Sequence, residues 1–319
     1  MREALFIKKN KDRWLRNQVI PADDPDEVAV EFTQLVDDLA FAKTFYQQSK
    51  VTRYLNAQAS KTYMSIYQNR KEEQNRLSDF WKFNVPLTVR RHHTVLLFVA
   101  LIFIAFFIVG FYSSAHDEGF LREMLGDDYV NMTEANIAQG KPFGVYAQGN
   151  ELLMWLGIMI NNIFTSFNYF AAGILFCFPS IISLINEGVR LGAFEQLFFS
   201  KGLGLESVLT VFIHGTLEIS AIVIAVGAGV VMGKGWIFPG TRKRLDAFKQ
   251  GAKDGVKILV SLVPIFMVAA FFEGFVTRYD SMPKWLSGMI LLGSASFIAW
   301  YYIIYPILLQ KRLRRNSHH

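Results

Sequence analysis

The side chains best able to do chemistry in this chain lie inside long apolar segments. His214 and Glu218 open the stretch HGTLEISAIVIAVGAGVVMG, and Glu273 stands in the stretch FFEGFV. Ionisable side chains are costly in a bilayer, and they normally face a partner or serve a function. An imidazole beside carboxylates can hold helices together, relay protons or ligate a metal ion. Which of these it does depends on the helices that carry the three residues.

The composition of the chain is typical of a membrane protein. Of its 319 residues, 52% are hydrophobic and only 19% are charged, whereas soluble domains average about 25% charged residues. The net charge of +6 fits the Lys and Arg residues that membrane proteins keep on the cytoplasmic side, so we expect no nucleic acid among the partners. A single cysteine, Cys177, cannot build a disulfide framework or a thiolate metal site.

Apolar runs and helical spacing predict an all-α, polytopic transmembrane protein with an N-terminal cytoplasmic helical region. We expect that region at residues 1–93, a transmembrane domain at 94–310 and a basic cytoplasmic tail at 311–319. The expected crossings number about six, at residues 94–112, 165–186, 188–201, 206–233, 256–277 and 286–308.

The weakest of these crossings is 188–201, because a helix of its length spans only ~21 Å. We expect this segment to be shielded by protein or to be re-entrant. In the alternative, residues 151–186 cross twice. Pro179 is expected to kink the crossing at 165–186, and Arg190 is expected at its cytoplasmic end beside Glu187.

The charges of the loops predict the orientation. The loop 113–150 holds six acidic and two basic residues, whereas residues 233–257 hold seven basic and two acidic ones. Since Lys and Arg are enriched on the cytoplasmic side, we expect the first loop outside and the second inside. Both termini are then cytoplasmic, and the location is the cytoplasmic (inner) membrane.

Helix geometry predicts that the polar residues meet. His214 and Glu218 are four residues apart and share one helix face. Nearly the same face carries a stripe of small residues that allows close helix approach, namely Ala221, Ala225, Gly229 and Gly233. Consecutive spans are usually neighbours, which brings Glu273 to the same level. The predicted polar cluster consists of His214, Glu218 and Glu273, with Asn162, Glu195 and Arg278 around them.

Three interpretations of this cluster are open. A structural network that fixes helix packing is the one we favour. A proton or ion path is the second, and a metal site made of His214, Glu218 and Glu273 is the third. The two-histidine motif of zinc proteases is missing, so we predict no catalytic residue, no enzymatic activity and no cofactor.

Several stretches of the chain resemble one known family. AAGILFCFPSIISLINEGVRLGAF, HGTLEISAIVIAVGAGVVMGKG and FFEGFVTR are similar to the stage II sporulation protein M family, and the His-Gly-x-x-Glu stretch is the most specific of them. Trp14, DDLAFAKTF, YLNAQ and the pair Ile66–Tyr67 resemble the N-terminal helices of its longer members.

The resemblance implies a membrane scaffold. In sporulating bacteria, the family member joins a partner membrane protein and peptidoglycan-degrading enzymes during engulfment of the forespore. Longer members also occur without sporulation, often encoded beside an AAA-type ATPase of the MoxR kind. This chain differs from the sporulation version by its region 1–93, its crossing at 286–308 and its charged tail. The engulfment role is therefore not carried over, and the resemblance supplies no catalytic residue.

The sequence thus predicts an integral membrane scaffold that organises partner proteins at the cell envelope. Its expected partners are the lipid bilayer and other membrane or envelope proteins, and the small-residue stripe makes a homodimer an option. A transporter or channel with a polar His/Glu site in the outer half of the membrane is the first alternative. An intramembrane metal-dependent enzyme is the second alternative.

Overall fold

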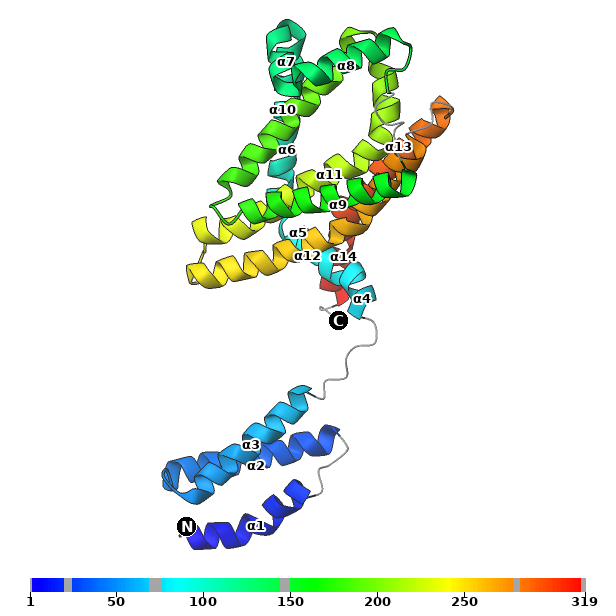
Figure 1. Cartoon of the computed structure of the whole chain (residues 1–319). Coiled ribbons are helices and arrows are strands. Elements are labelled where there is room, and N and C mark those ends of the chain that lie inside the picture. The colour runs from blue at the N-terminus through cyan, green and yellow to red at the C-terminus, as the bar shows by residue number, and fades with distance from the viewer. Residues whose placement is uncertain (1, 20–24, 69–75, 144–149, 278–281, 317–319) are drawn as a thin grey trace. The chain divides into compact units, whose positions relative to one another are not determined.

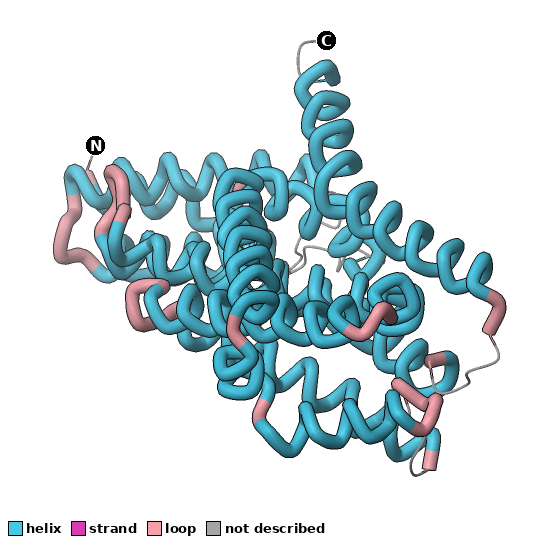
Figure 2. Tube along the Cα trace, turned by 90° about the horizontal axis from the view of Figure 1, so that it is seen from above, coloured by secondary structure: helices cyan, strands magenta, loops and turns pink. Residues whose placement is uncertain are grey.

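The computed structural model describes residues 2–19, 25–68, 76–143, 150–277 and 282–316, and in these ranges all regular structure is helical. The expected all-α fold is confirmed (Figures 1 and 2). The chain divides into two compact units, Met1–Arg76 and Leu77–His319. The boundary lies earlier than the expected 93/94 because Val85 and Val89 are fully buried in the core of the second unit.

The first unit has a core of its own. It consists of α1 (Glu3–Val19), α2 (Pro25–Phe45) and α3 (Lys50–Gln68). The buried side chains that pack together come from all three helices: Phe6, Trp14, Leu39, Ala42, Val51, Leu55 and Ala59. Asp38 holds α1 to α2, because its carboxylate accepts hydrogen bonds from Trp14 Nε1 at 2.8 Å and from Arg13.

The second unit begins with short helical pieces that lead into the long helices. These pieces are α4 (Arg76–Asp79), the π-helical turn η1 (Phe80–Asn84) and α5 (Val85–Arg91). The long helix α6 (His93–His116) follows, and then the shorter α7 (Glu118–Leu125) and α8 (Asp127–Ala138). The remaining elements are α9 (Glu151–Ala172), α10 (Phe178–Ser200), α11 (Gly204–Ile237), α12 (Arg244–Phe271), η3 (Phe272–Val276), α13 (Lys284–Ala299), η4 (Trp300–Ile304) and α14 (Tyr305–Asn316).

Among the described residues, four continuous helical segments are long and apolar enough to cross a membrane: His93–His116, Gly204–Ile237, Arg244–Val276 and Lys284–Asn316. They contain the expected crossings 94–112, 206–233 and 286–308, and all of 256–277 except its last residue. The chain therefore has the helices of a multi-pass membrane protein.

The structure corrects the expected helices between residues 151 and 201. Instead of segments at 165–186 and 188–201, it has α9 and α10, separated by a turn at 173–177. Phe176 and Cys177 adopt left-handed backbone conformations with φ of 55° and 66°, which ends α9. Pro179 then lies in the first turn of α10, where proline starts a helix rather than kinking it.

The position of this turn shows that α9 runs along the α11–α12 pair. A Cβ atom on Gly173 would lie 2.2 Å from the carbonyl oxygen of Gly229 in α11. At the other end of α9, Trp155 Nε1 donates a hydrogen bond to the carbonyl oxygen of Met267 in α12, at 3.1 Å. The helices α9, α11 and α12 accordingly lie side by side in Figure 1.

The centre of the second unit is α11. In the most apolar part of α11, half of the residues are buried. In the most apolar parts of α6 and of Lys284–Asn316, only 17% of the residues are buried. Its buried side chains join those of α5, α9 and α12 in one hydrophobic core. The residues on α11 and on the end of α12 are therefore positioned by protein on several sides.

Candidate functional site

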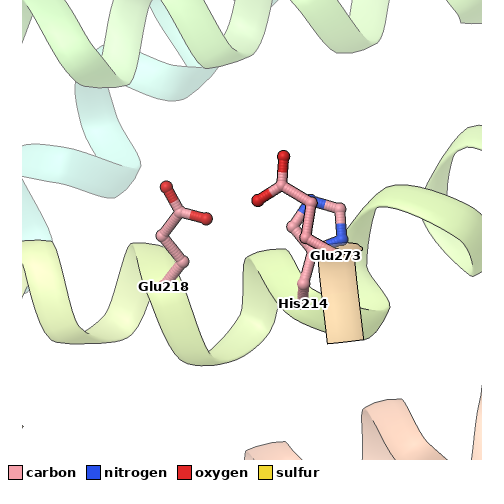
Figure 3. Close-up of side chains that lie close together, drawn as sticks. All are labelled: His214, Glu218 and Glu273. Carbon is pink, nitrogen blue, oxygen red and sulfur yellow. The ribbon is translucent and has the colours of Figure 1, made fainter. Parts of the chain in front are cut away.

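Three of the predicted polar residues come together. His214 and Glu218 lie one turn apart on α11, and Glu273 reaches over from η3, at the end of α12. One ring nitrogen and one oxygen of each carboxyl group lie within 4.8 Å of one another. Figure 3 shows the two carboxyl groups on the same side of α11, with Glu273 in front of the His214 ring in this view. His214 is 4% exposed, and the two glutamates are half-buried.

A π-helical turn positions Glu273. In η3 the backbone N–H of Thr277 donates to the carbonyl oxygen of Phe272, five residues earlier, at 2.8 Å. Such single π-turns insert one extra residue into a helix and occur frequently at functional sites. The wider turn changes the direction of the side chains that follow α12, and it places both Glu273 and Thr277 against α11.

The hydrogen bonds of Thr277 assign the tautomer of His214. The Thr277 hydroxyl donates to the carbonyl oxygen of Phe272 at 3.1 Å, and its oxygen lies 3.1 Å from His214 Nδ1. Since that hydroxyl proton is already donated, Nδ1 carries the proton of the second hydrogen bond. The lone pair of the ring is then on Nε2.

Two further helices contribute polar groups to the cluster. Asn162 of α9 is buried, and its amide faces the carboxyl group of Glu218. Its Nδ2 atom, however, has no hydrogen bond of good geometry to any described residue. Glu187 of α10 is close enough to act electrostatically on Glu218, and it accepts a hydrogen bond from the Tyr169 hydroxyl at 3.4 Å.

Glu187 and Tyr169 are members of this polar region that the sequence analysis missed. The expected helix break near residue 187 put Glu187 and Arg190 at a helix end, whereas both lie in the middle of α10. There they line a cavity of about 390 Å³ together with residues of α7 and α8, among them Tyr129. The charged pair in the stretch NEGVR could have indicated these residues. It does so only when the helix break between α9 and α10 is placed at Phe176–Pro179, which puts the pair in the middle of a helix.

The remaining predicted residues lie elsewhere or cannot be placed. Glu195 is buried on α10, where its partner is the Ser207 hydroxyl at 3.2 Å, and it is not a member of the three-residue group. Arg278 lies outside the described residues.

The small-residue stripe is used inside the chain. Ala221, Ala225, Gly229 and Gly233 are all buried. A Cβ atom on Gly233 would lie 2.3 Å from the carbonyl oxygen of Gly173, so the stripe receives the turn between α9 and α10. It therefore offers no surface to a second copy of the chain.

A second polar cluster, also not predicted, centres on Asp254 of α12. Its side chain is 1% exposed and accepts hydrogen bonds from Arg91 at 3.0 Å, His92 at 3.1 Å and Gln250 at 3.1 Å. A cavity of about 670 Å³ beside it is also lined by Lys234 and Arg242. This cluster ties the segment before α6 to the start of α12.

An ion pair fastens the helices that follow α6 to the end of α10. Lys201 Nζ lies 2.6 Å from Glu134 Oε1 of α8. The hydrogen bond from Lys201 lowers the pKa of Glu134 from its ordinary value, despite the opposing effect of burial. Glu134 remains charged at neutral pH and can hold α8 in place.

The geometry of the three-residue cluster is compatible with each of the three kinds of chemistry predicted from the sequence. Two carboxyl groups and an imidazole can exchange protons or share a cation. His214, Thr277 and Glu273 also join α11 to the end of α12, as a structural network would.

Comparison with known families agrees with this architecture. The family model described as stage II sporulation protein M matches residues 98–278, which is more than half of the chain. A domain of unknown function, DUF8413, matches residues 4–68, within the first unit. The comparisons with curated proteins and with solved structures found no match. The match over residues 98–278 includes α9, α10, α11 and the cluster residues of η3, and the chain belongs to the stage II sporulation protein M family.

Proposed function

We propose that this membrane protein is a scaffold that organises partner proteins at the cell envelope. The observation that carries this proposal is the division of the chain into a separately cored helical unit and a closely packed membrane unit. Such a division suits an adaptor, because the first unit can bind a partner without disturbing the packing of the second. The scaffold role that the family resemblance implies points the same way.

The surface of the first unit supports docking. Several large apolar side chains on its three helices remain exposed, including Leu5 at 58%, Val30 at 57% and Phe45 at 62%. These exposed side chains can contribute to contact with another protein where they form a contiguous patch. The match of residues 4–68 to a recognised domain supports its being a module of its own.

The membrane unit has the character of a rigid platform. Its helices meet at glycines, and a Cβ atom on Gly110, Gly173 or Gly192 would lie 2.2 Å from the backbone of the facing helix. The apolar faces of α6 and α13 remain exposed, for example at Leu97, Ile108 and Leu292. These faces are available to lipid, to partner spans or to a second copy of the chain.

We propose six crossings, with α9 and α10 as the second and third. At 22 residues, α9 is about 33 Å long, which matches a bilayer core of about 30 Å. With the positive-inside rule, the first unit, the loop between α11 and α12 and the C-terminus are cytoplasmic. The helices α7 and α8 are then outside, in the cytoplasmic (inner) membrane.

Transport of a proton or cation is the second candidate. It is favoured by Glu187, which extends the acidic groups of the cluster onto α10 and toward the cavity beside α7 and α8. The close glycine contacts between the helices of the membrane unit favour the scaffold over transport.

The scaffold is tested by site-specific photo-crosslinking in intact membranes. A photoreactive residue in place of Phe45 should yield a discrete adduct with a partner protein. The double variant Val30→Glu/Val36→Glu should abolish this adduct, because charges on the exposed apolar surface oppose docking. The control Asn56→Glu adds a charge at an exposed polar position, and it should leave the adduct intact.

Two results would contradict the scaffold. The first is that the full-length chain forms no adduct when the photoreactive residue is placed, in turn, at each exposed apolar position of the first unit. The second is cation flux into liposomes by the purified protein that Glu218→Gln abolishes, which would favour transport.

A further inference from the structure

We propose that His214, Glu218 and Glu273 bind one divalent first-row transition-metal ion. Their ligand atoms lie within 4.8 Å of one another. Metal–nitrogen and metal–oxygen bonds to such ions are about 2.0–2.2 Å long, so two ligands of a tetrahedral ion are separated by about 3.4 Å. Small side-chain rotations close the remaining gap, with no movement of α11 against α12.

The carboxyl groups of the cluster are suited to binding a cation. Two carboxyl groups from different elements face each other, and Glu187 adds a third acidic group nearby. Within the described part of the chain, no Lys or Arg forms an ion pair with Glu218 or Glu273. Ionised carboxylates held together away from water repel one another strongly, so they take up protons or bind a cation, and a divalent ion neutralises two of them at once.

The surroundings of His214 are those of a metal ligand. Histidines that bind metals usually donate their other N–H group to a neighbouring oxygen, which fixes the ring and its tautomer. Here Nδ1 donates to Thr277, and Thr277 donates to the backbone of Phe272. This chain of hydrogen bonds puts the ring proton on Nδ1 and the lone pair on Nε2, which is the nitrogen that would bind the ion.

A separate observation comes from α9. Asn162 is 6% exposed, its amide faces Glu218, and its Nδ2 atom has no hydrogen-bond partner of good geometry among the described residues. A buried amide without such a partner is rare in a folded protein. With a metal ion bound, the Asn162 amide would donate to a ligating carboxylate or present its oxygen as a fourth ligand.

The donor set selects the class of ion. One nitrogen and two or three oxygens, with no sulfur, suit Zn²⁺, Fe²⁺ or Mn²⁺. Ca²⁺ needs six to eight oxygen ligands, and Mg²⁺ prefers an octahedron of oxygens that includes several waters. Zn²⁺ is therefore the probe of choice, because it accepts four ligands of this mixed kind.

The test uses the full chain in detergent, with the terminal histidines replaced (His318→Ala/His319→Ala) to remove adventitious binding. After chelation and reloading with Zn²⁺, elemental analysis should find one zinc per chain. Glu218→Gln and Glu273→Gln should each weaken binding at least 100-fold, and Thr277→Val about 10- to 100-fold. Glu195→Gln is the matched control, because it changes a buried glutamate outside the cluster, and it should bind zinc as the parent chain does.

X-ray absorption of the zinc-loaded parent chain keeps the proposal testable if a variant fails to fold. The expected spectrum has nitrogen and oxygen ligands with a single histidine. The proposal is overturned by a parent chain that retains no more zinc than a folded Glu218→Gln/Glu273→Gln variant, or by a spectrum with several histidines or a sulfur ligand. None of these outcomes depends on partner capture, so they leave the scaffold proposal standing.

Discussion

The buried ionisable residues of this chain fall into two kinds that differ in their hydrogen-bond donors. Asp254 is nearly inaccessible, and Arg91, His92 and Gln250 all donate to it. Glu218 and Glu273 face an imidazole, an amide and each other. The first arrangement is satisfied and therefore structural, whereas the second has unused capacity to bind a proton or a cation.

Asp254→Ala is expected to lower the free energy of unfolding by about 1–3 kcal/mol, because three donors lose a charged acceptor. Asp246→Ala removes an exposed carboxylate from the same helix, and it should change stability by less than about 0.5 kcal/mol. Thermal or denaturant unfolding of both variants in detergent measures the difference. Equal effects of the two substitutions would show that Asp254 does not join α5 to α12.

Part of the site could be predicted at the level of single residues. The four-residue spacing of His214 and Glu218, and the succession of two spans, were enough to predict that Glu273 meets them. The environment of Asp254 could not be predicted, because two of its three hydrogen-bond donors, Arg91 and His92, lie more than 160 positions away in the sequence. Glu195 was expected around the same cluster, and its apolar context indicated burial but not that its hydrogen-bond partner would be Ser207.

At the scale of elements, glycine contacts decide how the helices pack. Gly173 and Gly233 meet where the turn after α9 rests on α11, and Gly188 and Gly192 bring α10 against α6. At such contacts the backbones of two helices touch directly, because glycine has no side chain between them. This close approach allows the dispersion contacts that drive association of helices in lipid. They fix the distance of α9 from α11, and with it the position of Asn162.

Gly173→Ala should destabilise the membrane unit by about 1–3 kcal/mol, because the added methyl group would lie 2.2 Å from the Gly229 carbonyl oxygen and overpacking has costs of this size. The matched control is Gly157→Ala, also in α9, where a Cβ atom meets nothing within 4 Å. This control should be neutral or stabilising by up to about 1 kcal/mol. Steric trapping or denaturant titration in micelles measures both, and a Gly173→Ala variant as stable as Gly157→Ala would disprove the close contact.

Hydropathy predicted four of the long helices because an apolar run of about 20 residues is typical of a membrane-spanning helix. It could not locate the break between α9 and α10. Phe176 and Cys177 adopt the left-handed conformation that glycine usually signals, and proline can either kink a helix or begin one. Because of this ambiguity, the sequence analysis placed Glu187 and Arg190 at a helix end, whereas they lie in the middle of α10.

At the scale of the whole molecule, function depends on two units with different tasks. The first unit matches a domain of unknown function, and the second carries the match to the stage II sporulation protein M family. In the account proposed above, the first unit binds partners. The second anchors them and places a metal-binding cluster where α9, α11 and α12 meet.

The central claim is that α11 and the end of α12 bring Glu218 and Glu273 into contact inside the protein. Cross-linking of Glu218→Cys with Glu273→Cys, in a Cys177→Ser background with a protease site between α11 and α12, tests it most directly. A short thiol-to-thiol reagent should join the two fragments rapidly and in high yield. The control pair Glu218→Cys/Val268→Cys should stay separate, because Val268 is 46% exposed on another face of α12. Efficient linkage of the control pair, with none between positions 218 and 273, would contradict the account.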